Sequence, residues 1–162
     1  MRHADVLVVG GGPAGSTCAW KLKAAGMDVV VLDKAEFPRL KLCAGWITPE
    51  AVEDLELDVG AYPHRFLTFE RLECHWKALS FRKKTTQHSI RRFEFDDYLL
   101  RRSGADVVTH KVKRIEREGD EYVVDGEFRA RYLVGAGGTA CPVYRAFFTD
   151  RSPRVKPLQI AT

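Results

Sequence analysis

The chain has 162 residues, of which 45% are hydrophobic and 30% charged, and its formal net charge is +4. This length suits one domain with its own core. The mild positive charge, with no platform of stacking aromatic residues beside it, argues against nucleic-acid binding. No apolar run approaches the roughly 20 residues that span a bilayer, and no signal-peptide pattern precedes the first predicted strand. We therefore expect a cytoplasmic protein, for which contact with an acidic membrane surface is one use of the positive charge.

The four cysteines are widely spaced and form no C-x-x-C pair. In a cytoplasmic chain this spacing predicts free thiols, and the scattered histidines predict no metal site.

The first predicted elements form one continuous unit. An apolar, β-branched run at residues 6–9 predicts a strand buried on both faces. Gly10-Gly11-Gly12-Pro13-Ala14-Gly15 follows it and satisfies G-x-G-x-x-G. A helix then ends before Gly26, because glycine tolerates the left-handed conformation at a helix C-terminus. A second strand at residues 29–32 ends on Asp33.

Each part of this unit has a mechanical reason. Gly10 permits a tight turn, Gly12 lets a phosphate approach the backbone, and Gly15 lets the helix pack close to the strand. The N–H groups of the first helical turn and the helix dipole favour a pyrophosphate. Asp33 lies 23 residues after Gly10 (33 − 10), near the spacing of about 20 expected of a carboxylate that binds a ribose. The alternative, a glycine-rich turn in an ordinary α/β domain, does not need three glycines so placed. We interpret the unit as a dinucleotide-binding one.

Beyond Asp33 the chain departs from a plain succession of strands and helices. Residues 37–46 read as an irregular loop containing a proline and a glycine. Thr48 is a good N-cap for a helix from Pro49 to about residue 57. Strand patterns at 66–69 and 78–81 then predict an antiparallel insertion at about 62–92.

The last part of the chain alternates between short elements. They are a helix at 95–102, a strand at 107–108, alternating segments at 112–117 and 121–125, an extension at 127–130 and a buried strand at 132–134. Together the elements predict one α/β domain over residues 1–162. Its expected form is a Rossmann-like dinucleotide-binding fold with a mainly parallel sheet and an antiparallel β arm.

Four stretches carry a family resemblance. They are the glycine motif with Asp33, then Phe37-Pro38-Arg39-x-Lys41-x-Cys43-x-Gly45, then Arg92-x-x-Phe95-Asp96-x-x-Leu99, and finally residues 132–138 leading to Val143-Tyr144-Arg145. In this order they resemble the FAD-dependent oxidoreductases of the geranylgeranyl reductase and p-hydroxybenzoate hydroxylase-like group. The first stretch is shared by many nucleotide-binding proteins, whereas the second and third in combination are more specific.

The resemblance implies FAD as the cofactor, with NADH or NADPH as the reductant, and it implies a set of binding residues. Gly10, Gly11, Gly12, Pro13, Ala14 and Gly15 would cradle the pyrophosphate, Asp33 would hold the adenosine ribose, and Lys34 and the backbone of Val112 would lie by the adenine. Arg39, Lys41 and the Cys43-Ala44-Gly45 turn would approach the flavin ring, Arg92 would lie near the phosphates and ribityl chain, and Ala136, Gly137 and Gly138 would form the second glycine motif.

Plainer roles remain open for several of these residues. Arg39 and Lys41 can be surface charges, and Cys43 can be a small buried filler. Arg92 can form a surface ion pair with Glu94 or Asp96.

Two departures from the family bear on function. Position 137 is glycine where the family's second motif usually has an aspartate, and the resembled enzymes continue well beyond the length of this chain. No general acid, base or nucleophile stands out. We therefore weigh a flavin-dependent reductase or monooxygenase whose active site is completed by a partner chain or by self-association, as in half of a split enzyme. The alternatives are an FAD- or NAD(P)-binding module without turnover, and a non-functional remnant.

Overall fold

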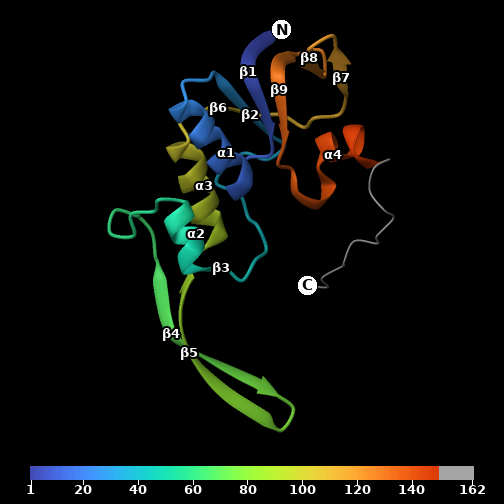
Figure 1. The fold of residues 1–162 in the computed structure, drawn as a ribbon. Helices are drawn as coiled ribbons and strands as arrows, with labels where there is room; N and C mark the ends of the chain where they lie inside the picture. The colour runs from blue at the N-terminus through green and yellow to red at the C-terminus, as the bar shows by residue number, and fades with distance from the viewer. Residues whose placement is uncertain (150–162) are drawn as a thin grey trace. The chain divides into compact units, whose positions relative to one another are not determined.

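The computed structural model describes residues 1–149, and its chain divides into two compact units (Figure 1). Residues 1–36 and the chain from Arg102 onward form the first unit, and residues 37–101 form the second. Residues 150–162 of the expected single domain lie outside the described part. That the two units act as one domain stays a prediction.

The first unit is built on a six-stranded sheet in the order β6-β2-β1-β9-β8-β7. The strands are β1 (Arg2–Val9), β2 (Val29–Asp33), β6 (Asp106–Thr109), β7 (Ile115–Glu118), β8 (Glu121–Val124) and β9 (Phe128–Gly135). β6, β2, β1 and β9 are parallel, and β9, β8 and β7 form an antiparallel meander. With the antiparallel sheet of the second unit, this arrangement confirms the predicted α/β fold class.

Helix α1 (Pro13–Ala24) connects β1 to β2 and packs against both strands. A 3₁₀ turn, η1 (Gly138–Ala140), and helix α4 (Pro142–Phe147) follow β9. The two central strands are buried on both faces, since every residue from Val6 to Val9 and from Val29 to Leu32 is at most 4% exposed. This confirms the two strands predicted around the glycine motif and fixes the carboxyl edge of the sheet, where both end.

The second unit contains a three-stranded antiparallel sheet in the order β3-β5-β4. Its elements are β3 (Trp46–Ile47), α2 (Pro49–Asp54), β4 (Leu67–Trp76), β5 (Leu79–Ser89) and α3 (Arg92–Arg102). Its core comprises Leu57, Tyr62, Ile90, Phe95 and Leu99. β4 and β5 lie within the antiparallel insertion predicted at about 62–92, whereas β3 lies before it and begins in the segment predicted as an irregular loop.

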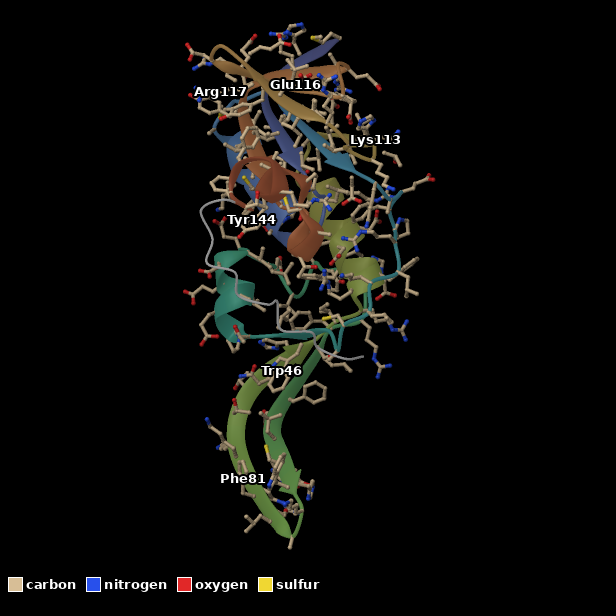
Figure 2. The ribbon with its side chains drawn as sticks, turned by 90° about the vertical axis from the view of Figure 1, so that its right-hand side faces the viewer. Trp46, Phe81, Lys113, Glu116, Arg117 and Tyr144 are labelled. Atoms are coloured by element: carbon tan, nitrogen blue, oxygen red, sulfur yellow. The ribbon has the colours of Figure 1, made fainter. Side chains whose placement is uncertain are left out.

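β4 and β5 form a long hairpin (Figure 1). The side chains on its two faces differ in character. Alternation along the strands and the cross-strand register put Leu72, Cys74, Trp76, Leu79 and Phe81 on one face, where Lys83 also lies, opposite Leu72. Trp76, Leu79 and Phe81 are each more than half exposed. Phe81 is labelled on the curved hairpin in Figure 2. The opposite face carries Arg71, Glu73, His75, Arg82 and Lys84. We call these the apolar and the charged face of the hairpin.

Helix α2 and strand β7 are shorter than the sequence pattern predicts. α2 ends at Asp54 because Glu56 adopts a left-handed conformation with φ +47°. The sequence has no glycine at this position to signal the end of the helix. β7 begins at Ile115 because the amides of Lys113 and Arg114 donate to the carboxylate of Asp125 instead of to a neighbouring strand.

The segments predicted at 127–130 and 132–134 are one strand, β9. β9 pairs with β1 on both sides of the charged Arg131, from Arg2 with Phe128 to Ala4 with Ala130 and from Val6 with Tyr132 to Val9 with Gly135. The prediction that 132–134 is buried is wrong at Tyr132, which is 49% exposed, because alternation puts it on the face opposite Leu133, a half-buried residue that packs against the core.

Candidate functional site

The turn after β1 has no room for side chains at two of its glycines. Gly10 has φ +112°, and a Cβ there would lie 2.4 Å from the carbonyl oxygen of Ala136 at the end of β9. A Cβ on Gly15 would lie 1.8 Å from the carbonyl oxygen of Gly10. The first glycine therefore admits the neighbouring strand, and the second lets α1 pack directly on the turn, as the motif predicts.

The first turn of α1 presents unpaired amides. Gly12 is the N-cap, Pro13 follows it, and the first turn contains no acidic residue. Within residues 1–149 the amides of Gly12, Ala14 and Gly15 have no hydrogen-bond acceptor, whereas Ser16 closes the first helical bond to the carbonyl of Gly12 at 2.9 Å. Unpaired N–H groups at the positive end of a helix dipole attract an anion, and no side chain of this turn competes for them.

Asp33 closes the other side of the same turn. Its side chain is 9% exposed, and its Oδ2 accepts a hydrogen bond from the amide of Gly11 at 2.7 Å. Its Oδ1 accepts from the amide of Ala35 at 2.9 Å. These two bonds hold the carboxylate beside the glycine turn.

A cavity of about 270 Å³ opens at this carboxyl edge of the sheet, near the lower end of the usual volumes of small-molecule sites. Its lining comprises Val9, Gly10, Leu32, Asp33, Lys34, His110, Lys111, Val112, Gly137, Ala140, Pro142 and Arg145. Two lysines and an arginine face one carboxylate there, so the lining carries an excess of positive charge. Apolar walls with such an excess suit an adenosine joined to a phosphate chain.

The predicted residues of the second unit gather around a buried carboxylate. Asp96 on α3 is fully buried, and its two oxygens accept from Nε and Nη2 of Arg92 at 2.6 and 2.8 Å. Nη2 of Arg39 lies 3.4 Å from Asp96 Oδ2, and its guanidinium covers the ring of Phe37 at 4.8 Å. Arg92 thus pairs with one of the two acids considered for it, although that acid is buried. The pairing raises the pKa of Arg92.

Cys43 is exposed, so it is not the buried filler that the sequence left open. The amide of Gly45 donates to its sulfur at 3.4 Å. This bond outweighs burial and, with the nearby guanidinium of Arg92, lowers the pKa of the Cys43 thiol. Gly45 cannot carry a side chain, because a Cβ would lie 1.9 Å from the carbonyl oxygen of Ile90. Lys41, Cys43, Ala44 and Arg92 line a second cavity, of about 430 Å³, within this unit.

Five of the residues predicted from the sequence line the cavity of the first unit, namely Gly10, Asp33, Lys34, Val112 and Gly137. Gly11, Gly12, Pro13, Ala14 and Gly15 form the adjoining turn, and Ala136 and Gly138 flank Gly137. His110, Lys111, Ala140, Pro142 and Arg145 were not predicted as site residues. The pattern Tyr144-Arg145 after the second glycine motif was the one available signal for the last of them.

Position 137 has little space for the aspartate usual in the family. A Cβ on Gly137 would lie 3.1 Å from Cα of Cys141 and 3.3 Å from Cδ of Pro142. The segment that follows η1 therefore crowds this position, and glycine fits it.

The fold and this turn define a Rossmann-like dinucleotide-binding protein. Residues 8–80 match the family model described as an NAD(P)-binding Rossmann-like domain. An uncharacterized protein of Methanosarcina barkeri is 36% identical over 158 residues, which are 91% of this chain and 40% of that protein. The menaquinone reductase of Mycobacterium tuberculosis is 35% identical over 88% of this chain and 39% of its own length. The geranylgeranyl diphosphate reductase of Rhodobacter capsulatus is 29% identical over 93% of this chain and 41% of its own length.

Solved structures agree on the fold. PqsL, a probable FAD-dependent monooxygenase from Pseudomonas aeruginosa, superposes with a TM-score of 0.75 at 19% identity, over 96% of this chain and 48% of that one. In sequence the chain is similar to menaquinone reductases and to geranylgeranyl reductases, as its motifs predict. It spans less than half the length of these relatives. Among residues 1–149, no helix is both long and apolar enough to cross a bilayer.

Proposed function

We propose that this chain binds FAD and forms the cofactor-binding part of a flavin-dependent oxidoreductase. The adenosine ribose binds Asp33, the pyrophosphate lies against the amides at the start of α1, and the adenine enters the cavity beside Val112. The observation that carries the proposal is the 2.7 Å bond that turns the Asp33 carboxylate toward the glycine turn. The amides of the same turn support it, because they have no acceptor among the described residues and can donate hydrogen bonds to a bound anion.

A flavin-binding measurement tests the proposal. Purified chain mixed with FAD and then separated from free cofactor should keep the visible flavin bands. In Asp33→Asn the acceptor for the amide of Gly11 is kept but the charge is lost, so FAD binding should weaken roughly tenfold to hundredfold, the value of a charge-assisted hydrogen bond. Asp120→Asn, in an exposed turn, is the matched control and should bind as wild type does.

The outcomes separate the competing functions. A colourless wild-type chain that takes up no FAD would refute the proposal and leave a nicotinamide-binding module or a remnant. FAD binding of full strength in Asp33→Asn would remove Asp33 from the site.

The oxidoreductase half of the proposal concerns what the bound flavin does. When bound, FAD supplies the hydride or electron transfer, and this chain's residues hold and orient it. The relatives named as reductases support this role. The family model described as NAD(P)-binding supports NADH or NADPH as the reductant. Bleaching of the flavin bands by either nucleotide at an enzymatic rate would favour an enzyme, whereas stable yellow protein would favour a binding module.

A partner chain, or a second copy, completes the substrate site in this proposal. The support is that the apolar side chains on one face of the hairpin are exposed. A gene next to this one that encodes the rest of the relatives' length would favour a split enzyme. The mass of the purified chain in solution would identify a homo-oligomer. The expected contacts of Arg39, Lys41, Cys43, Ala44, Gly45 and Arg92 with the flavin stay predictions.

A further inference from the structure

One wall of the dinucleotide cavity is a chain segment without secondary structure, residues 110–114, which joins β6 to β7. His110, Lys111 and Val112 line the cavity. Lys113, which follows them, is labelled in Figure 2. No strand pairing fixes this segment, so other bonds must hold its backbone where a ligand would meet it.

The carboxylate of Asp125 supplies most of those bonds. Its Oδ2 lies 2.7 Å from Nε2 of His110. Its Oδ1 accepts from the amide of Arg114 at 2.7 Å, and the amide of Lys113 lies 3.1 and 3.2 Å from the two oxygens. The amide of Asp125 donates in turn to the carbonyl of Arg114 at 2.9 Å. A single residue therefore holds both ends of the segment.

A second anchor ties the segment to the ribose-binding residue. The amide of His110 donates to the carbonyl of Asp33 at 2.6 Å. The start of the cavity wall is thus joined to Asp33 through the backbone and to Asp125 through the imidazole.

Asp125 is itself held in place by a tight turn. It has φ +50° and Gly126 has φ +70°, and the amide of Glu127 donates to the carbonyl of Val124 at 3.0 Å. Two left-handed residues in this order form the type I′ turn that joins β8 to β9. The side chains of Asp125 and His110 are only 11% and 18% exposed. The turn therefore presents a nearly buried, pre-oriented carboxylate to the segment.

We propose that Asp125 is a positioning residue for the adenosine half of the bound dinucleotide, acting through residues 110–114. This inference rests on the function proposed above. Asp125 does not line the cavity and so acts only through the segment. Without its carboxylate, two amides and an imidazole lose their acceptor, and the wall beside Val112 is released from the conformation that fits the adenine.

Two variants and a control test this role. Asp125→Gly keeps the left-handed turn and removes every side-chain acceptor, and Asp125→Asn keeps the turn and one acceptor oxygen. Asp120→Gly, in the exposed turn between β7 and β8, is the matched control. Each is titrated with FAD, with AMP and with inorganic pyrophosphate, and amide hydrogen exchange is followed at residues 110–114.

We expect Asp125→Gly to weaken AMP and FAD binding by the same factor, roughly tenfold or more, and to leave pyrophosphate binding unchanged. Asp125→Asn should lose less affinity for AMP and FAD, and Asp120→Gly should bind both as wild type does. Exchange should quicken at the amides of Lys113 and Arg114 in Asp125→Gly. A general loss of structure would instead weaken all three ligands together.

Unchanged AMP binding in a folded Asp125→Gly chain would overturn the inference, and so would equal weakening of AMP and pyrophosphate. If Asp125→Gly does not fold, Asp125→Asn decides by the same criteria. If the wild-type chain binds neither FAD nor AMP, the proposed function fails and no ligand role remains for Asp125. In that case, amide exchange at 110–114 that stays slow in Asp125→Gly would also refute the inference that Asp125 fixes the conformation of this segment.

Discussion

Replacing Asp96 with alanine should destabilise the protein more than any charge removal at the surface. The substitution leaves the guanidinium groups of Arg92 and Arg39 without the carboxylate that they share. Breaking a buried ion pair costs about 3–5 kcal/mol. Each arginine side chain is 19% exposed and can turn toward water, so the lower end, about 3 kcal/mol, applies. For a chain of 162 residues, at about 2–4 °C per kcal/mol, this lowers the melting temperature by roughly 6–12 °C.

Thermal unfolding followed by circular dichroism measures this loss. The control is Asp97→Ala, one residue further along the same helix. The Asp97 side chain is 17% exposed, but its partner, Arg101, is 73% exposed, so solvent screens the pair. Such surface pairs are worth about 0–1 kcal/mol, so the control should melt within about 4 °C of wild type. If Asp96→Ala melts no lower than Asp97→Ala, the buried carboxylate does not hold this unit together and the reasoning fails.

Three further predictions concern the turn, the cavity wall and the exposed thiol. Gly15→Ala should lower both FAD binding and stability, by about 1–3 kcal/mol in unfolding free energy, because its Cβ would overlap the carbonyl of Gly10; chemical denaturation checks this. Burial raises the pKa of Asp125, but hydrogen bonds from the imidazole and two amides outweigh it, so the native pKa lies below the ordinary value. The stability that Asp125 contributes is therefore present above the unfolded pKa and is lost as pH falls through the native one; the melting temperature of Asp125→Asn should depend less on pH over that acidic range. Cys43 should be alkylated before the other cysteines at mildly alkaline pH, because the amide of Gly45 lowers its pKa and the thiol is exposed; peptide mapping after brief treatment with iodoacetamide would identify the first site.

The first half of the site could be predicted because it is local. The strand, glycine turn, helix and acid lie within 33 consecutive residues, and each residue type matches a backbone requirement at its position. The structure places Gly10 and Gly15 where a side chain would overlap a carbonyl oxygen. Local chemistry also predicted the start of α2, where Thr48 accepts from the amide of Ala51 at 3.3 Å.

The rest depends on contacts between distant residues, which no local pattern contains. The cavity is lined by residues far apart in the sequence, from Val9 to Arg145, so the positive charge of its lining could not be predicted from any one stretch. Arg131 interrupts the apolar pattern of β9, but backbone pairing with β1 on both sides of Arg131 makes the two segments one strand. The segment before β7 looked like a strand because its side chains alternate, yet its amides bond to Asp125.

The two faces of the hairpin also govern how the protein behaves at high concentration. The outer edge of β4 has no strand beside it within the described residues. On the apolar face of the hairpin, Trp76, Leu79 and Phe81 are exposed to solvent. Such an edge is a template for aggregation, and the ammonium groups of Lys83 and Lys84 on the hairpin oppose it by keeping copies apart. Salt screens that repulsion and leaves the apolar attraction intact, so colloidal stability in this chain falls as ionic strength rises.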